Sequence, residues 1–104
     1  MFGTTGYLAA KPGMENDLKT FVEKFGNSPN IVSICLYKVN SDQNDFIEFI
    51  LWVDKNAHDE TSSQPDFPAA YQNLLDLLAE EPRWYSGEMV YESFSGIQSQ
   101  VGHS

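Results

Sequence analysis

The sequence is poor in basic residues and in cysteine. Six Lys and Arg residues stand against fifteen Asp and Glu, which gives a formal net charge of −9. Proteins meet nucleic acids and anionic membranes mainly through Lys and Arg, so this balance argues against both as partners. The single cysteine, Cys35, excludes an internal disulfide framework and a zinc site built from several cysteines.

Long apolar segments are absent as well. The longest uninterrupted apolar stretch covers residues 49–53, whereas a membrane-spanning helix needs roughly 20 such residues. The N-terminal segment MFGTTGYLAA has neither a basic start nor an unbroken apolar stretch, which does not fit a signal peptide. We therefore expect a cytoplasmic protein whose cysteine stays reduced.

Several catalytic signatures are missing too. The sequence has no Gly-rich phosphate loop, no Gly-x-Ser-x-Gly and no His-Glu-x-x-His. An enzyme with this sequence would have to work with few polar groups in an apolar pocket. The length of 104 residues, 41% of them hydrophobic, predicts one folded domain. We place that domain at residues 1–94 and a polar C-terminal tail at residues 95–104.

Four segments have the composition of strands, namely residues 2–10, 31–39, 46–53 and 87–94. The second and third are rich in β-branched and aromatic residues, which favour strands. The polar residues 41–45 between them predict a turn, so these two strands should form a hairpin.

Apolar residues recur at helical spacing in the remaining segments. Residues 18–25 carry one such stripe, and residues 67–78 carry another. A short helix should begin near Lys55 with Asp54 as its cap, and Asp66 is the expected cap of the next one. The order is β-α-β-β-α-β with the second helical region broken in two. It predicts a ferredoxin-like α+β fold, in which an antiparallel sheet carries its helices on one face.

The third predicted strand, residues 46–53, is apolar on both faces. A strand with one wet face should alternate apolar and polar residues, but here Glu48 is the only charged residue. We interpret Glu48 as a wet position near the hairpin turn rather than the rim of a cavity. The second apolar face favours a homodimer in which two sheets pack face to face, although a few exposed apolar side chains would also be normal.

His58 is the only histidine inside the predicted domain. A metal site is disfavoured because Asp59 and Glu60 do not share a helix face with it. Histidine exchanges protons near neutral pH, so a role as catalytic base or proton relay is the functional interpretation. A histidine on a helix surface with solvated neighbours is the structural alternative.

Four aromatic residues are candidates for lining a ligand pocket, namely Trp52, Tyr7, Tyr37 and Tyr71. An indole N–H or a phenol hydroxyl can orient an oxygen atom of a ligand. The structural alternative is that each one packs in the core and completes a hydrogen bond there. Cys35 lies in the middle of a predicted strand, where we expect a small buried hydrophobic side chain rather than a nucleophile.

The sequence resembles the antibiotic biosynthesis monooxygenase family, a branch of the dimeric α+β barrel proteins. The resemblance covers about residues 3–94. It lies in the order and spacing of several pieces: Lys11-Pro12-Gly13 before an amphipathic helix, the hairpin ending in Trp52, the segment at residues 52–58, and Pro65 and Phe67 at the next helix. A strand-end Trp followed five residues later by Ala is typical of this family.

The resemblance implies a ferredoxin-like fold that dimerises through its sheets. It also implies oxidation of polycyclic phenols or quinols by O2 without a metal or organic cofactor, the phenolate itself supplying the electrons. Many members carry histidines where this chain has Thr61 and Asp66, whereas His58 directly follows Ala57 as in another subset. A related branch degrades haem through a histidine on the last helix, and residues 67–78 contain none.

We therefore predict a cofactor-independent monooxygenase acting on a small aromatic substrate. His58 would accept a proton, Tyr71 and Tyr37 would orient oxygen, Trp52 would form a wall, and Tyr7 would line the same pocket. Two alternatives share this fold. One is a ligand-binding or stress-related dimer without activity, and the other is an isomerase or dechlorinating enzyme with a polar pocket.

Overall fold

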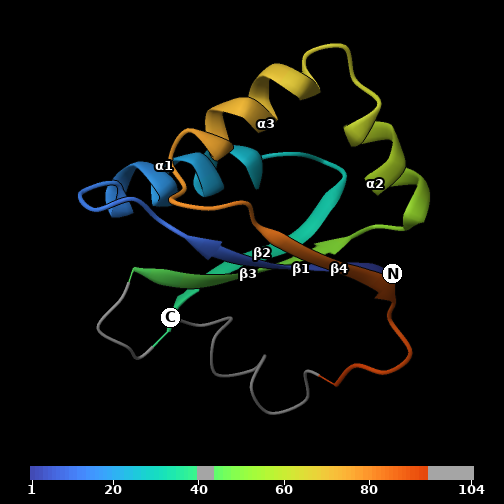
Figure 1. Cartoon of the computed structure of the whole chain (residues 1–104). Coiled ribbons are helices and arrows are strands. Elements are labelled where there is room, and N and C mark those ends of the chain that lie inside the picture. The colour runs from blue at the N-terminus through green and yellow to red at the C-terminus, as the bar shows by residue number, and fades with distance from the viewer. Residues whose placement is uncertain (40–43, 94–104) are drawn as a thin grey trace.

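The computed structural model describes residues 1–39 and 44–93 of the chain. Within these residues, all three helices lie on one face of a four-stranded sheet (Figure 1). The ferredoxin-like α+β fold predicted from the sequence is confirmed, and the second helical region is broken in two as expected. The elements in chain order are β1 (Phe2–Ala9), α1 (Glu15–Phe25), β2 (Ile31–Lys38), β3 (Asp45–Trp52), α2 (Lys55–Ser62), α3 (Phe67–Leu75) and β4 (Arg83–Glu88).

The strands lie in the order β2-β3-β1-β4, and every neighbouring pair is antiparallel. This order puts β1 and β3 in the middle of the sheet and leaves β2 and β4 at its edges. Thr4 of β1 pairs with Ile50 of β3 on one side and with Ser86 of β4 on the other. Thr4 therefore lies directly between Ile50 and Ser86 in the sheet.

The hydrophobic core lies between the sheet and the helices. Leu8 from β1 and Leu18 from α1 are almost completely buried. Around them pack residues from every layer, namely Ala10, Val22, Phe46, Leu74 and Leu78. Leu78 follows α3, which ends at Leu75 instead of continuing to residue 78, and Leu78 forms an isolated bridge with Ala10.

The two predicted helix caps have different outcomes. The carboxylate of Asp54 accepts a hydrogen bond from the backbone N–H of Ala57 at 2.8 Å, which confirms the predicted cap of α2. Asp66 makes no side-chain cap hydrogen bond at α3, so that prediction is wrong. The backbone explains the difference, because Asp54 is extended as a capping residue needs to be, while Asp66 is already helical.

The last strand was predicted at residues 87–94, but β4 covers Arg83–Glu88. Its partner sets these limits. β4 pairs with β1 from Tyr7 opposite Arg83 to Phe2 opposite Glu88. Beyond that register β1 has no further residues to pair with, apart from Met1, whose carbonyl accepts the N–H of Met89. Residues 41–43 of the predicted hairpin turn and the predicted tail, residues 95–104, lie outside the described residues.

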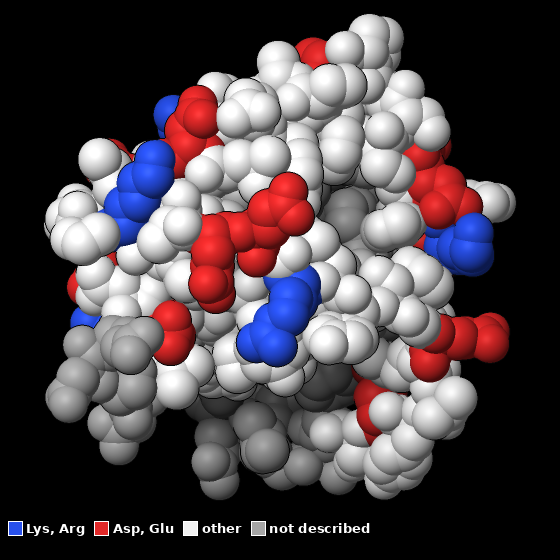
Figure 2. All heavy atoms as spheres, viewed as in Figure 1, with Lys and Arg blue, Asp and Glu red and all other residues white. Residues whose placement is uncertain are grey.

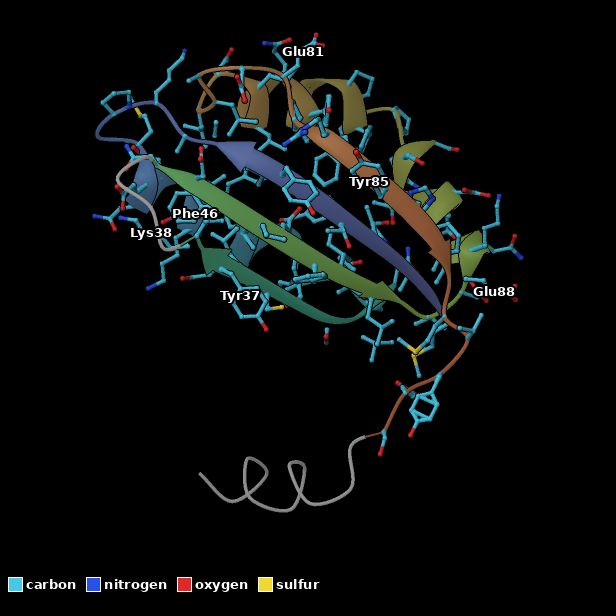
Figure 3. The ribbon with its side chains drawn as sticks, turned by 60° about the horizontal axis from the view of Figure 1, so that its bottom comes forward. Tyr37, Lys38, Phe46, Glu81, Tyr85 and Glu88 are labelled. Carbon is cyan, nitrogen blue, oxygen red and sulfur yellow. The ribbon has the colours of Figure 1, made fainter. Side chains whose placement is uncertain are left out.

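The sheet face opposite the helices carries large side chains that no part of the described chain covers. Figure 3 turns this face forward and shows Tyr37 and Tyr85 on it. Tyr37 packs edge-on against Phe49 with ring centroids 5.6 Å apart, and Tyr7 packs in the same way against Tyr85 at 6.0 Å. Cys35, opposite Phe49 in the register, is exposed rather than buried as predicted.

Charged side chains are scattered over the molecule. On the face drawn in Figure 2, Asp and Glu are interspersed with uncharged residues, and the few Lys and Arg side chains form no continuous basic patch. No helix within residues 1–39 and 44–93 is long and apolar enough to cross a membrane.

Candidate functional site

A cavity of about 250 Å³ lies between the helices and one end of the sheet. This volume is slightly below the roughly 300–1,000 Å³ of typical ligand sites, so it fits a small ligand. Six of its fifteen lining residues are large aromatic side chains from α1, α3, β3 and β4, namely Phe21, Phe25, Trp52, Phe67, Tyr71 and Trp84. Its lining contains no Lys or Arg among the described residues.

Trp52 ends β3 and forms one wall of this cavity, with only 3% of its surface exposed. Its indole N–H donates to the hydroxyl of Thr4 at 3.1 Å. The Thr4 and Ser86 hydroxyls are 3.3 Å apart and share a hydrogen bond. This row across three strands fixes the indole ring, because a buried N–H needs an acceptor. Trp52 therefore offers the cavity a flat apolar surface and not a free donor.

Tyr71 projects from α3 into the same cavity. The indole N–H of Trp84 donates to the Tyr71 oxygen at 2.9 Å. Since that oxygen already accepts a hydrogen bond, the phenol proton is available to donate elsewhere. No acceptor for it is found within the described part of the chain. Tyr71 thus presents a positioned phenol hydroxyl at the cavity wall.

Trp84, which was not among the predicted site residues, positions Tyr71. Its six-membered ring covers Gly6 of β1 so closely that a Cβ atom there would lie 2.3 Å from it. A glycine inside a strand often marks a site where another group approaches closely. Gly6 between Thr5 and Tyr7 is the signal that could have indicated an aromatic partner on the neighbouring strand.

His58 on α2 lines the cavity with a side chain that is 28% exposed. Its ring packs edge-on against Trp52 at 5.2 Å and tilted against Phe2 at 5.1 Å, measured between ring centroids. Nδ1 lies 2.9 Å from a carboxylate oxygen of Asp59. These contacts hold the imidazole at the mouth of the cavity between two aromatic rings.

Asp59 determines which nitrogen of His58 carries the proton. The carboxylate of Asp59 also accepts a hydrogen bond from Lys55 Nζ at 2.7 Å, and this contact, followed by the one from His58, lowers the pKa of Asp59 below its ordinary value. An ionised carboxylate can only accept hydrogen bonds, so Nδ1 must be the donor. The neutral imidazole then has its lone pair on Nε2, the nitrogen able to accept a proton from a ligand.

Glu48 is the most unexpected residue of this cavity. It lies in β3 on the helix-facing side, with only 3% of its surface exposed, so the interpretation as a wet position near the turn is wrong. Alternation along the strand explains this, because Phe46, Glu48, Ile50 and Trp52 all share the buried face. Burial raises the pKa of Glu48 from 4.5 to about 7.

The structure brings together three of the five predicted site residues. Trp52, His58 and Tyr71 line one cavity. Tyr7 and Tyr37 do not lie there, because both pair with Ile47 and share its face of the sheet, opposite Glu48. Tyr7 is 40% exposed and Tyr37 57% exposed on that open face. They could reach a ligand only from outside the cavity.

Within the described residues, no group of three or more His, Cys, Asp or Glu side chains is arranged to hold a metal ion. Asp59 contacts His58 from the adjacent position, but its remaining hydrogen bond goes to Lys55. A lysine ammonium competes with a cation for that carboxylate.

No protein-family model and no curated protein sequence matches this chain, so its similarity to known proteins lies in the fold. Many solved structures do match, and many of these are antibiotic biosynthesis monooxygenases. SnoaB from Streptomyces nogalater, a cofactor-independent oxygenase solved as a single-site variant, has a TM-score of 0.73 and 15% identity, covering 88% of this chain and 94% of SnoaB.

Two further structures give the same result. A protein from Deinococcus radiodurans, provisionally assigned as an antibiotic biosynthesis monooxygenase, has a TM-score of 0.73 and 14% identity, with 89% of this chain and 96% of that chain covered. Another antibiotic biosynthesis monooxygenase has a TM-score of 0.68 and 17% identity, with 88% and 100% covered. The chain therefore has the ferredoxin-like α+β fold of antibiotic biosynthesis monooxygenases, as the resemblance in its sequence predicts.

Proposed function

We propose that this protein is a cofactor-independent monooxygenase that oxidises a small aromatic phenol or quinol with O2. The observation that carries the proposal is the convergence of a proton acceptor, His58, and a hydrogen-bond donor, Tyr71, on one aromatic cavity. The fold shared with SnoaB, a cofactor-independent oxygenase, supports the same chemistry.

Each of three residues has a distinct task in this reaction. Nε2 of His58 takes the phenol proton, because Nδ1 is committed to Asp59. The phenolate formed is the electron-rich species that O2 can oxidise. Tyr71 donates its free proton to an oxygen atom of the substrate, and Trp52 holds the substrate's ring plane. The aromatic wall keeps water away from the reactive intermediate.

The electron balance needs no further reductant. For an anthrone-type phenol, the ring methylene becomes a carbonyl, and two C–H bonds break. This change supplies the four electrons that reduce O2. One oxygen atom enters the product as the new carbonyl, and the other leaves as water together with the two hydrogens.

Oxygen uptake by the purified protein tests this function. Metal-stripped protein is incubated with anthrone- and quinol-type phenols while an electrode follows O2. We expect uptake that depends on protein concentration and continues in excess chelator. Uptake that the chelator abolishes would contradict a cofactor-independent reaction. No uptake across the panel would move the assignment to a binding protein.

We further propose that two chains pack through the open sheet face. Tyr37, Phe49, Val53 and Tyr85 are each more than 40% exposed there, and a contiguous apolar face is unusual for a monomer. Sedimentation of wild-type protein should therefore give twice the chain mass. Phe49→Lys places a charge in this face and should yield monomers, while Lys38→Ala outside the apolar patch should not. A monomeric wild type at micromolar concentration would contradict the dimer.

A further inference from the structure

Glu48 is a buried acid in apolar surroundings. Its neighbours on the same face of β3 are Phe46 and Ile50, and its register partners are Gly6 in β1 and Leu36 in β2. None of these can neutralise a carboxylate or donate a side-chain hydrogen bond to it. Glu48 lines the cavity, so its side chain borders open space there.

The other polar groups of the cavity are mostly committed to one another. Trp52, Thr4 and Ser86 form one hydrogen-bonded row, and the Trp84 indole is bound to Tyr71. Glu48 has neither a hydrogen-bond nor an ion-pair partner within residues 1–39 and 44–93. It is therefore a polar side chain, more than nine-tenths buried, whose remaining contact is the cavity.

The titratable groups facing this cavity come from only three elements. They are Glu48 from β3, His58 from α2 and Tyr71 from α3, while the lining residues of α1, β1 and β4 are uncharged. No Lys or Arg side chain within the described residues lines the cavity beside Glu48. Above pH 7 a ligand in the cavity therefore meets the negative charge of the Glu48 carboxylate.

Burying an acid without a partner destabilises a protein unless the group is satisfied in another way. A ligand hydroxyl can satisfy Glu48, because an ionised carboxylate only accepts hydrogen bonds and a hydroxyl can donate one. A ligand carboxylate would place two like charges in an apolar site. A phenol that ionises inside the cavity differs, because its proton stays on His58 and the charge of the phenolate is compensated there. The unpaired Glu48 thus favours one ligand chemistry and opposes another.

We propose that Glu48 is the specificity-determining residue of the cavity: it accepts a hydrogen bond from a hydroxyl group of a neutral aromatic ligand and rejects aromatic ligands that carry a carboxylate. This inference deepens the proposed function, on which it rests for the ligand class. Binding measurements without turnover can test it separately.

A titration with two matched probes tests this role. 1-Naphthol and 1-naphthoate share a ring system and differ in the group that would meet Glu48. The indole N–H signals of Trp52 and Trp84, which both line the cavity, report binding in a nitrogen–proton NMR spectrum. Titrations of the full chain are run at pH 8 and pH 6, where 1-naphthoate stays ionised, with wild type and Glu48→Gln.

At pH 8 we expect wild type to bind 1-naphthol about tenfold or more tightly than 1-naphthoate, since hydrogen bonds to charged groups exceed neutral ones by about this factor. Glu48→Gln should lose most of that preference, mainly by binding 1-naphthoate more tightly. Lowering the pH to 6 should reduce the preference of wild type for 1-naphthol over 1-naphthoate. The preference of Glu48→Gln should change less. Any contribution from His58 is present in both proteins and cancels in the comparison.

Glu23→Gln is the matched control, because Glu23 is an exposed carboxylate of α1 that does not line the cavity. It should behave as wild type. The proposal would be overturned if the affinity ratio of 1-naphthol to 1-naphthoate in Glu48→Gln stayed within twofold of the wild-type ratio. It would also be overturned if wild type failed to bind 1-naphthol at millimolar concentration. Protein that binds 1-naphthol through Glu48 but takes up no O2 would keep this inference and contradict only the oxidation reaction.

Discussion

Replacing His58 with glutamine is expected to lower phenol oxidation by a factor of about 10² to 10⁴, the usual contribution of a positioned general base. Glutamine keeps much of the side-chain volume between Trp52 and Phe2, but its amide cannot take a proton at neutral pH. The initial rate of O2 uptake with a substrate from the phenol panel gives the measurement.

Binding and chemistry should separate in this variant. Because the cavity wall is retained, the affinity for 1-naphthol should change by less than about threefold while kcat falls. Glu60→Gln, an exposed substitution on the same helix that does not line the cavity, should leave kcat unchanged. Unchanged turnover in His58→Gln would remove His58 from the reaction and leave Glu48 as the remaining carboxylate or imidazole base in the described cavity.

Replacing Glu48 with glutamine is expected to change how stability depends on pH. Raising the pKa of a carboxyl from 4.5 to about 7 on folding corresponds to about 3 kcal/mol. The folded state holds this proton more tightly than the unfolded state. The contribution is therefore fully present below pH 4.5, is lost as the pH rises to about 7, and changes little above that.

Urea unfolding of both proteins at pH 5 and pH 8 measures this effect. The free energy of unfolding of wild type should fall relative to that of Glu48→Gln by about 2 to 3 kcal/mol between the two pH values. Other titrating groups are common to both proteins and cancel, provided that the protein concentration is the same. Parallel pH profiles would show that Glu48 is not buried as an isolated acid, and would contradict the cavity geometry.

The elements of this fold follow from local patterns in the sequence. The helical spacing around Leu18 and Val22 places α1, and Asp54 marks the start of α2 because its extended backbone lets the side chain cap the helix. β4 could not be placed in the same way. Its limits come from pairing with β1, which lies far away in the sequence.

The site was predictable only in part, and β3 shows why. Its residues are apolar on both faces, so the alternation puts Glu48 on the same face as Trp52 but cannot say which face the helices cover. The position of the helices determines which face is covered, and they cover the face that carries Glu48. Tyr7 and Tyr37 therefore lie on the open face, since both are opposite Ile47. Trp52, His58 and Tyr71 line the same cavity because the end of β3, α2 and α3 surround it.

In the proposed reaction the cavity binds a phenol, and one oxygen atom from O2 is inserted into it. The most direct measurement is mass spectrometry of the product formed by metal-stripped protein under ¹⁸O₂. The proposed reaction should give one new oxygen atom in the quinone, carrying the label, and product formation that falls by about 10² to 10⁴ in His58→Gln. A product whose new oxygen comes from unlabelled water, or label incorporation that His58→Gln leaves unchanged, would contradict it.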